Sequence, residues 1–294
     1  MPERIPELDK DVKDKLEKVG IEMDKEKRSA IFLQVDQKVE TSSSFASSIE
    51  MISIKKALEK YDWLHDYFWK VVSRDKDEYT KEVDVEDVNG YFIRALPGAK
   101  VDFPVEACLY LKSPKKQKVH NIIIAEENSE LNIISGCASH PGLTTGMHLG
   151  ISEFYVKKNA KLSFTMIHNW ENNIEVRPRS AAIVEEGGTY ISNYIIMNPV
   201  KIVQSYPTVH LNGDNSTAIM SSVIVAINDS IVDTGSRVII KGKGASAEIL
   251  SRAISKGGTI YSRGDIVGDS PDARGHLECM GMMLSEQGSI IAIP

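Results

Sequence analysis

The sequence is poor in cysteine, and the few cysteines it has show no pairing pattern. Cys108, Cys137 and Cys279 are the only three in 294 residues, and none belongs to a CxxC pair. An odd number of widely spaced cysteines excludes a disulfide framework, and the missing CxxC pairs argue against a zinc ribbon or a redox dithiol. Each cysteine is therefore either a small buried hydrophobic residue or a free thiol with a chemical role.

The chain also lacks an excess of positive charge and a long apolar run. Lysine and arginine number 35 against 41 acidic residues, which gives a net charge of −6. This charge predicts no broad attraction to nucleic acid or to anionic membranes. The sequence shows no signal-peptide pattern and no apolar run of membrane length, so we expect a cytoplasmic protein with no membrane partner.

The first 90 residues carry helical patterns that the rest of the chain does not. Apolar residues recur at helical spacing from Leu8 through Val12 and Leu16 to Val19, and Gly20 provides an end signal. A second helix is predicted to begin after Ser53. Its apolar face would hold Ile54, Ala57, Leu58, Tyr61, Leu64 and Phe68. With a predicted strand at 29–34 and a charged surface connection at 74–78, we expect an N-terminal helical or α+β region over 1–90.

From residue 91 onward, short strands rich in Val and Ile alternate with polar turns. A small residue opens a new strand at Ser129, Ala160, Gly188, Ser216, Ala245 and Gly288. The separations are 31, 28, 28, 29 and 43 residues, and Gly258 divides the last into 13 and 30. A repeat of nearly constant length made of strands predicts a solenoid of stacked β-coils over 91–294, with a sandwich or barrel as the second choice.

One predicted strand, residues 161–170, mixes polar rings into a row of core residues. Because alternate residues of a strand share a face, His168 and Trp170 continue the row of Leu162, Phe164 and Met166. Asn169 belongs to the opposite face. A polar group buried without a partner costs about 1–3 kcal/mol. The pattern therefore predicts a polar lining inside an apolar interior, which favours a channel or a site over plain packing.

Two cysteines are candidates for chemistry. Cys137 follows Gly136, which allows close approach of backbone or ligand. Cys279 shares its face with Leu277, whereas His276 and Glu278 take the opposite face. Thiolates prefer soft metals and iron–sulfur clusters, and imidazole or carboxylate can complete such a shell. Metal binding at Cys279 and His276 and simple burial of the thiols both remain open at this point.

Charged residues in turns leave further alternatives. The segment beginning at Gly213 and the one beginning at Asp233 are typical of ordinary turns, or of sugar or calcium sites in a β-helix enzyme. Arg177 and Arg179 flank Pro178 and share a face. They are either exposed or reach into the lining near Trp170.

Five motifs in order make the chain resemble a known family. They are Ser135-Gly-Cys-Ala, Met166-Ile-His-Asn-Trp, Tyr206-Pro-Thr with Gly213-Asp-Asn-Ser, Asp233-Thr-Gly-Ser, and Glu278-Cys279. Over about 95–294 the sequence resembles the SufB/SufD family, the core proteins of the SUF iron–sulfur cluster assembly system. The resemblance implies a mainly β protein with a right-handed parallel β-helix, whose subunits form homodimers or SufB/SufD-like heterodimers and carry a SufC-like ABC ATPase.

The resemblance also implies roles for individual residues. Cys279 falls on the family's essential cysteine, and Cys137 falls on the cysteine where sulfur is thought to enter. The lining between them is matched by His168, Asn169 and Trp170, and a basic residue of that lining would fall near Arg177 or Arg179. The implied cofactor is a transient iron–sulfur cluster, and the implied partners include a sulfur donor and apo iron–sulfur proteins.

The resulting prediction is a SufB-like scaffold that is not an enzyme. Cysteines at both central positions favour the SufB role. The family continues past the β-helix into a helical segment that docks the ATPase and completes the cluster site, and the sequence is expected to stop before it. The alternatives are a SufD-like structural subunit without its own cluster and, less favoured, a polysaccharide-active β-helix enzyme, which would show clustered carboxylates along a groove.

Overall fold

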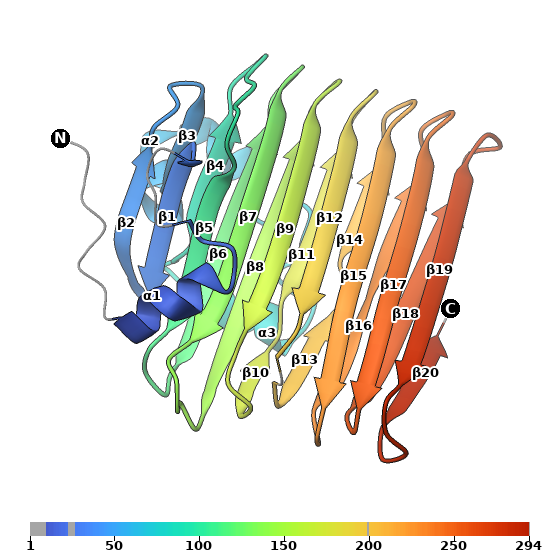
Figure 1. Ribbon diagram of the computed structural model, residues 1–294. Coiled ribbons are helices and arrows are strands. Elements are labelled where there is room, and N and C mark those ends of the chain that lie inside the picture. The colour runs from blue at the N-terminus through green and yellow to red at the C-terminus, as the bar shows by residue number, and fades with distance from the viewer. Residues whose placement is uncertain (1–9, 23–26, 199, 294) are drawn as a thin grey trace.

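Residues 10–22, 27–198 and 200–293 are described by the computed structural model, and they form a β-solenoid of about seven turns (Figure 1). Two long sheets face each other across the interior. Sheet I has the order β19 (Arg274–Met283), β17 (Ser246–Lys256), β15 (Thr217–Ile227), β12 (Thr189–Ile196), β9 (Lys161–Asn169), β7 (Glu130–Ser139), β5 (Val105–Leu111), β1 (Ala30–Val35), β2 (Lys38–Ser44).

Sheet II is built from the alternate strands of each coil. It contains β10 (Ile174–Val176), β13 (Ile202–Ser205), β16 (Ile231–Ile240), β14 (Thr208–Leu211), β11 (Arg179–Val184), β8 (Gly146–Val156), β6 (Lys116–Ala125), β4 (Tyr91–Ala95), β3 (Ile49–Ser53), β18 (Thr259–Gly268) and β20 (Ser289–Ile293). β10 and β11 follow one another in one coil, as do β13 and β14 in the next. The predicted mainly β solenoid is confirmed.

The strand registers explain the sequence repeat. In sheet I, Lys161 pairs with Glu130 on one side and with Thr189 on the other, and the same step then leads to Thr217 and Ser246. Gly258 and Gly288 precede a different pair, Thr259 and Ser289, in sheet II. The long last separation in the sequence therefore arose from comparing the two sheets. Ala273, before Arg274, takes the place that the repeat in sheet I requires.

The N-terminal segment extends the sheets of the solenoid. β1 pairs in parallel with β5 and antiparallel with β2, and β3 pairs antiparallel with β4. The boundary predicted at residue 90 thus falls inside two continuous sheets. The serine-rich stretch that begins at Glu40 forms most of β2, because its backbone completes the hydrogen bonding of β1.

Helices cover parts of the outer faces. α1 (Lys10–Glu17) places Val12 and Leu16 against sheet I beside Cys108, as its apolar spacing predicts, while Leu8 lies outside the described residues. α2 (Ile54–Lys60) is capped by the Ser53 side chain. In the part of the chain that the structure describes, no helix combines the length and apolarity needed to cross a membrane.

The second predicted helix is too long. α2 ends because Tyr61 adopts an extended conformation, and a 3-10 helix, η2 (Asp62–Asp66), follows it. The aromatic rings beyond Lys60 pack against Phe92 and Tyr155 of the solenoid instead of continuing one helical face. Tertiary packing here outweighs the helical period. The charged connection then leads into α3 (Glu78–Val83), which is capped by the Asp77 side chain.

A buried carboxylate fastens this N-terminal segment to sheet II. Glu153 of β8 is fully buried and accepts hydrogen bonds from the backbone N–H groups of Trp69 at 2.7 Å, Val71 at 2.6 Å and Val72 at 3.0 Å. Its second oxygen also lies 2.8 Å from Nε2 of His120. Four polar partners thus compensate the burial of one carboxylate.

Candidate functional site

A row that contains three serines, a tyrosine and a cysteine runs along the interior face of sheet I. The pairings carry it from Ser135 of β7 across the sheet to Cys279 of β19. In order, its members are Ser135, Met166, Tyr194, Ser222, Ser251 and Cys279. We call these six residues the polar row. The neighbouring interior row, which starts with Cys137 and His168 and continues with Ile196 and Ile224, becomes apolar after two strands.

Sheet II presents a complementary set of small residues to the polar row. Register places Gly150, Pro178, Ser205, Thr234 and Ser262 in line across sheet II, with Pro178 between β10 and β11. An enclosed cavity lies between the two sheets along the middle of these rows. Its lining includes His148, Met166, His168, Tyr194, Ser205, Ser222 and Thr234. Small side chains on facing strands leave this space unfilled, whereas the apolar rows on either side are closely packed.

Cys137 is fully buried beside one end of this cavity. Its Sγ lies 3.4 Å from Sδ of Met166, and its register partner in β9 is His168. Burial raises the pKa of the Cys137 thiol to about 12, and the nearby Ser135 side chain partly opposes this shift. The group is therefore a protonated thiol at neutral pH until a base or a ligand removes the proton.

His168 and Trp170 face the interior, as their spacing predicts. The hydroxyl of Tyr194 lies 3.3 Å from Nδ1 of His168, and the His168 and Trp170 rings are 5.8 Å apart. Asn169 faces the other way and accepts a hydrogen bond from Asn198, so it does not join the lining. The Nε1 atom of Trp170 is buried without a hydrogen-bond partner among the described residues.

Sequence reasoning missed His148, which reaches the same place from sheet II. Its ring lies 5.2 Å from the Trp170 ring, and its Nδ1 is 2.8 Å from Oε1 of Gln117. An amide oxygen can only accept, so Nδ1 donates and the lone pair sits on Nε2. The available signal was Gly150, two residues later on the same face, where a Cβ would lie 2.9 Å from Nε2 of His148.

We expect the two interior imidazoles to make the protein sensitive to acid. Burial lowers the pKa of His148 to about 4 and, together with the charge of His148, lowers that of His168 to about 3. Both groups bind protons more readily when unfolded, so stability falls as pH drops below about 6.5 toward the folded values. His168→Gln should reduce the loss of unfolding free energy between pH 7 and pH 5 by about 2 kcal/mol, measured by urea titration. The control is His276→Gln, at an exposed imidazole, which should leave the loss of unfolding free energy between pH 7 and pH 5 unchanged. Equal losses in both variants would contradict the assignment of the acid sensitivity to the interior imidazoles.

Cys279 lies at the other end of the polar row and is partly exposed. Its Sγ is 3.7 Å from Oγ of Ser262, which in turn lies 2.9 Å from Oγ of Ser251. His276 and Glu278 take the outer face, where Glu278 pairs with Arg252. β19 is a regular strand through these positions, so neither side chain approaches the thiol. Within the described ranges, no group of three or more His, Cys, Asp or Glu side chains is placed to hold a metal ion.

Arg177 and Arg179 do not line the interior, and the expectation that one of them would is wrong. Both guanidinium groups lie on the outer face of sheet II over the ring of Tyr79, at 5.3 and 5.0 Å from its centroid. The strand alternation instead turns Pro178 inward. A buried guanidinium would need a compensating charge that this interior lacks.

The segment at Gly213 forms a turn, as predicted, whereas the segment beginning at Asp233 lies inside strand β16, so its prediction as a turn is wrong. Asp214 accepts a hydrogen bond from the backbone of Lys243, and a Cβ at Gly213 would lie 1.9 Å from the backbone N of Glu186. Asp233 forms a bidentate ion pair with Arg263 on the outer face. These contacts account for both motifs as parts of the coil stacking.

The fold and its interior define a β-solenoid protein in which a polar row joins the neighbourhood of a buried thiol to a partly exposed one. Comparison with known families places it further. The family described as "SUF system FeS cluster assembly, SufBD core domain" matches residues 110–294. The chain belongs to this SufBD family of iron–sulfur cluster assembly proteins.

Full-length relatives agree with this assignment. An iron-sulfur cluster assembly SufBD family protein of Archaeoglobus fulgidus is 65% identical over 282 residues, covering 96% of this chain and 76% of the relative. A SufBD family protein of Methanothermobacter thermautotrophicus is 46% identical over 297 residues, covering 99% and 72%. One from Pyrococcus horikoshii is 25% identical over 305 residues, covering 100% and 68%.

Proposed function

We propose that this protein is a SufB-like scaffold, which receives sulfur and iron and holds a nascent cluster for transfer. The supporting observation is the polar row, which begins beside Cys137 and ends at Cys279. Such a scaffold is a container and not an enzyme. This function needs a thiol that receives sulfur, an enclosed path along which the sulfur moves, and a surface where a partner can accept the cluster.

Sulfur would arrive at Cys137 as the outer atom of a donor persulfide. The Cys137 thiolate attacks that sulfur, the donor S–S bond breaks, and the donor leaves as a thiolate. This exchange needs no external oxidant. A thiol reductant then attacks the inner sulfur of the Cys137 persulfide and releases hydrogen sulfide, leaving a mixed disulfide that a second thiol resolves. The proton of the Cys137 thiol would pass to the departing donor thiolate, so that the exchange is neutral overall.

The released sulfide would travel along the polar row. Hydroxyl groups of Tyr194, Ser205 and Ser222 offer hydrogen bonds through the cavity. The hydrogen bond between Ser251 and Ser262 links the two sheets between the cavity and Cys279. In this proposal the cargo passes when that pair separates.

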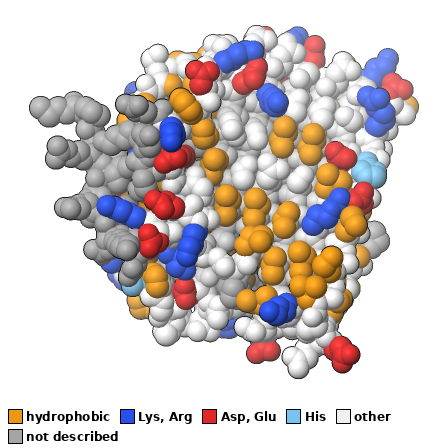
Figure 2. All heavy atoms as spheres, viewed as in Figure 1, with side chains coloured by type: hydrophobic (Ala, Val, Ile, Leu, Met, Phe, Trp, Pro, Cys, Tyr) orange, Lys and Arg blue, Asp and Glu red, His pale blue; other side chains and the backbone are white. Residues whose placement is uncertain are grey.

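Cys279 would bind iron together with ligands from another subunit. One thiolate does not complete a cluster site, and the described residues include no group of three or more His, Cys, Asp or Glu side chains that could do so. Apolar side chains gather over the outer face of the strands around it (Figure 2). Among the exposed apolar side chains on and after β19, Met280 and Met282 lie on this outer face, whereas Leu277 and Met283 share the face of Cys279 and Leu284 follows the strand. A second SufB/SufD-like subunit would cover such a surface, and a SufC-like ATPase would drive the assembly.

The incomplete ligand set also supports a second candidate, a SufD-like subunit that shapes the complex without its own cluster. Binding of a SufC-like ATPase, in a protein that takes up no iron, would favour it. Cluster uptake that depends on Cys279 would favour the scaffold.

Blocking the polar row should stop internal sulfur transfer. Ser222→Phe fills the cavity between Tyr194 and Ser251, so sulfur delivered by a persulfide donor should reach Cys137 but not Cys279. Transfer, followed anaerobically by mass spectrometry of the cysteine peptides, should fall at least about tenfold, equal to a barrier about 1.4 kcal/mol higher. Val223→Phe adds the same ring to the same strand on the outer face and is the control. Unchanged transfer in folded Ser222→Phe and Ser222→Leu would reject the route.

A further inference from the structure

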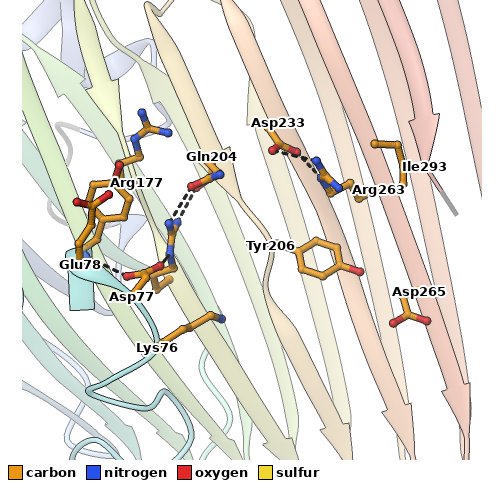
Figure 3. A pocket seen from close by; sticks show the side chains of 12 residues that line it. Lys76, Asp77, Glu78, Arg177, Gln204, Tyr206, Asp233, Arg263, Asp265 and Ile293 are labelled. Carbon is orange, nitrogen blue, oxygen red and sulfur yellow. Dashed lines mark hydrogen bonds and ion pairs between the residues drawn. The ribbon is translucent and has the colours of Figure 1, made fainter. Parts of the chain in front are cut away.

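A cleft of about 740 Å³ lies on the outer face of sheet II, where the start of α3 faces β11 and β13 (Figure 3). Charged side chains line it, and most are paired. Asp77 pairs with Arg179, Asp233 with Arg263, and Asp265 with Arg237. The proposed function gives this cleft no role.

The cleft and the interior cavity share one wall. Along the same two stretches of chain, alternate residues face alternate sides. The outer cleft is lined by Arg177, Arg179, Gln204 and Tyr206. The inner cavity is lined by Pro178, Ser180, Ser205 and Pro207. A single layer of backbone therefore separates outside from inside.

Two prolines, two residues apart in strand register, weaken this layer. Pro178 separates β10 from β11, and Pro207 separates β13 from β14. Neither has an N–H group to donate, so each removes one hydrogen bond from the sheet. On the inner side, small residues in register with the seam include Gly150, Ser205 and Thr234. We call the stretch at Pro178 and Pro207 the proline seam.

Arg179 closes the seam from outside. Its Nη1 donates to the carbonyl oxygen of Gln204 at 2.9 Å and to that of Pro178 at 2.9 Å, while Nη2 donates to Oε1 of Gln204. Its Nε donates to Asp77, the capping residue of α3. A side chain thus bridges the strands where an ordinary sheet would use a backbone hydrogen bond. Such a bridge can open by one rotamer change without unpairing either strand.

We infer that the proline seam is a lateral entrance to the interior cavity, latched by the Arg179–Asp77 pair, and that it admits a small uncharged sulfur compound such as hydrogen sulfide. Among the described residues, the inner lining has hydroxyl groups, two thioethers and imidazoles but no Asp, Glu, Lys or Arg side chain. A charged species would lose its hydration there without a compensating charge. A small neutral molecule such as hydrogen sulfide can form hydrogen bonds with the hydroxyl groups of the lining. The cargo rests on the proposed function; the entrance itself does not.

Thiol labelling tests the entrance. In a protein whose three cysteines are replaced by serine, a single reporter is introduced as Ser205→Cys, at the seam, or as Val209→Cys, which faces inward on β14 within the apolar core. Neutral methyl methanethiosulfonate should modify Ser205→Cys at least about tenfold faster than Val209→Cys. With a positively charged, trimethylammonium-bearing methanethiosulfonate, Ser205→Cys should no longer react faster than Val209→Cys. Ser251→Cys reports access from the β19 end and should react more slowly than Ser205→Cys.

The latch is tested in the same assay. Arg179→Ala should raise the labelling rate of Ser205→Cys about tenfold, and Pro178→Ala, which restores an N–H for the Gln204 carbonyl, should lower it. If Arg179→Ala does not fold, Pro178→Ala alone carries the test. Equal rates at positions 205 and 209, faster labelling at 251, or rates indifferent to the seam variants would overturn the inference. These readouts involve no cluster, so they stand apart from any failure of the scaffold function.

Discussion

Replacing Cys279 by serine is expected to abolish cluster formation when the protein is reconstituted anaerobically with ferrous iron and sulfide. Cys279 is the only cysteine with exposed surface, and the other two are buried. A thiolate is a soft ligand suited to iron–sulfur clusters, whereas a serine hydroxyl stays protonated and binds iron weakly. The visible absorption of the cluster and its iron content should both fall to near background.

Two matched variants make this result specific. Cys108 lies on the outer side of β5 beneath α1, and Cys108→Ser should keep the cluster. Cys137→Ser should keep it as well when free sulfide is supplied, because sulfide then bypasses the persulfide step. A Cys279→Ser spectrum equal to that of the unmodified protein would remove the basis of the scaffold proposal.

The second large effect concerns stability. Glu153→Ala should lower the free energy of unfolding by about 3–5 kcal/mol, because three buried backbone N–H groups and His120 would lose their hydrogen-bond acceptor. Urea unfolding followed by circular dichroism measures the loss. Residues 67–72 should also become sensitive to protease, since this carboxylate holds them to sheet II.

An exposed carboxylate provides the control. Glu185 pairs with Lys157 at 2.9 Å, and its side chain is 43% exposed. Surface ion pairs contribute about 0–1 kcal/mol, so Glu185→Ala should change stability little. Similar losses in the two variants would show that Glu153 has no special role as an anchor.

Most of the solenoid can be predicted from the sequence, because each coil repeats nearly the same spacing and each strand alternates its faces. Spacings of 28 to 31 residues became the strand registers of sheet I, and the alternation in 161–170 placed His168 and Trp170 inside. Both follow from local geometry, since strand alternation and coil length act within a few residues. The SufBD family assignment is confirmed, while the roles of Cys137 and Cys279 stay predictions.

Other features depend on contacts between distant segments. The outward position of Arg179 follows from Asp77, about a hundred residues earlier in the chain, and from a carbonyl in the next coil. His148 meets Trp170 only because two sheets face each other. The early end of α2 reflects aromatic packing on Phe92. No periodicity in one segment encodes such partners.

Because the coils stack uniformly, the distance between two strands of one sheet is set by the number of strands between them. Five steps separate β7 from β19 in sheet I, and each step spans about 4.8 Å, so the two thiol-bearing strands lie roughly 24 Å apart. Inserting or deleting one whole coil would change this reach by a fixed increment while leaving every side chain on its own face. Insertions or deletions of whole coils therefore change the distance between two such strands in steps of one coil.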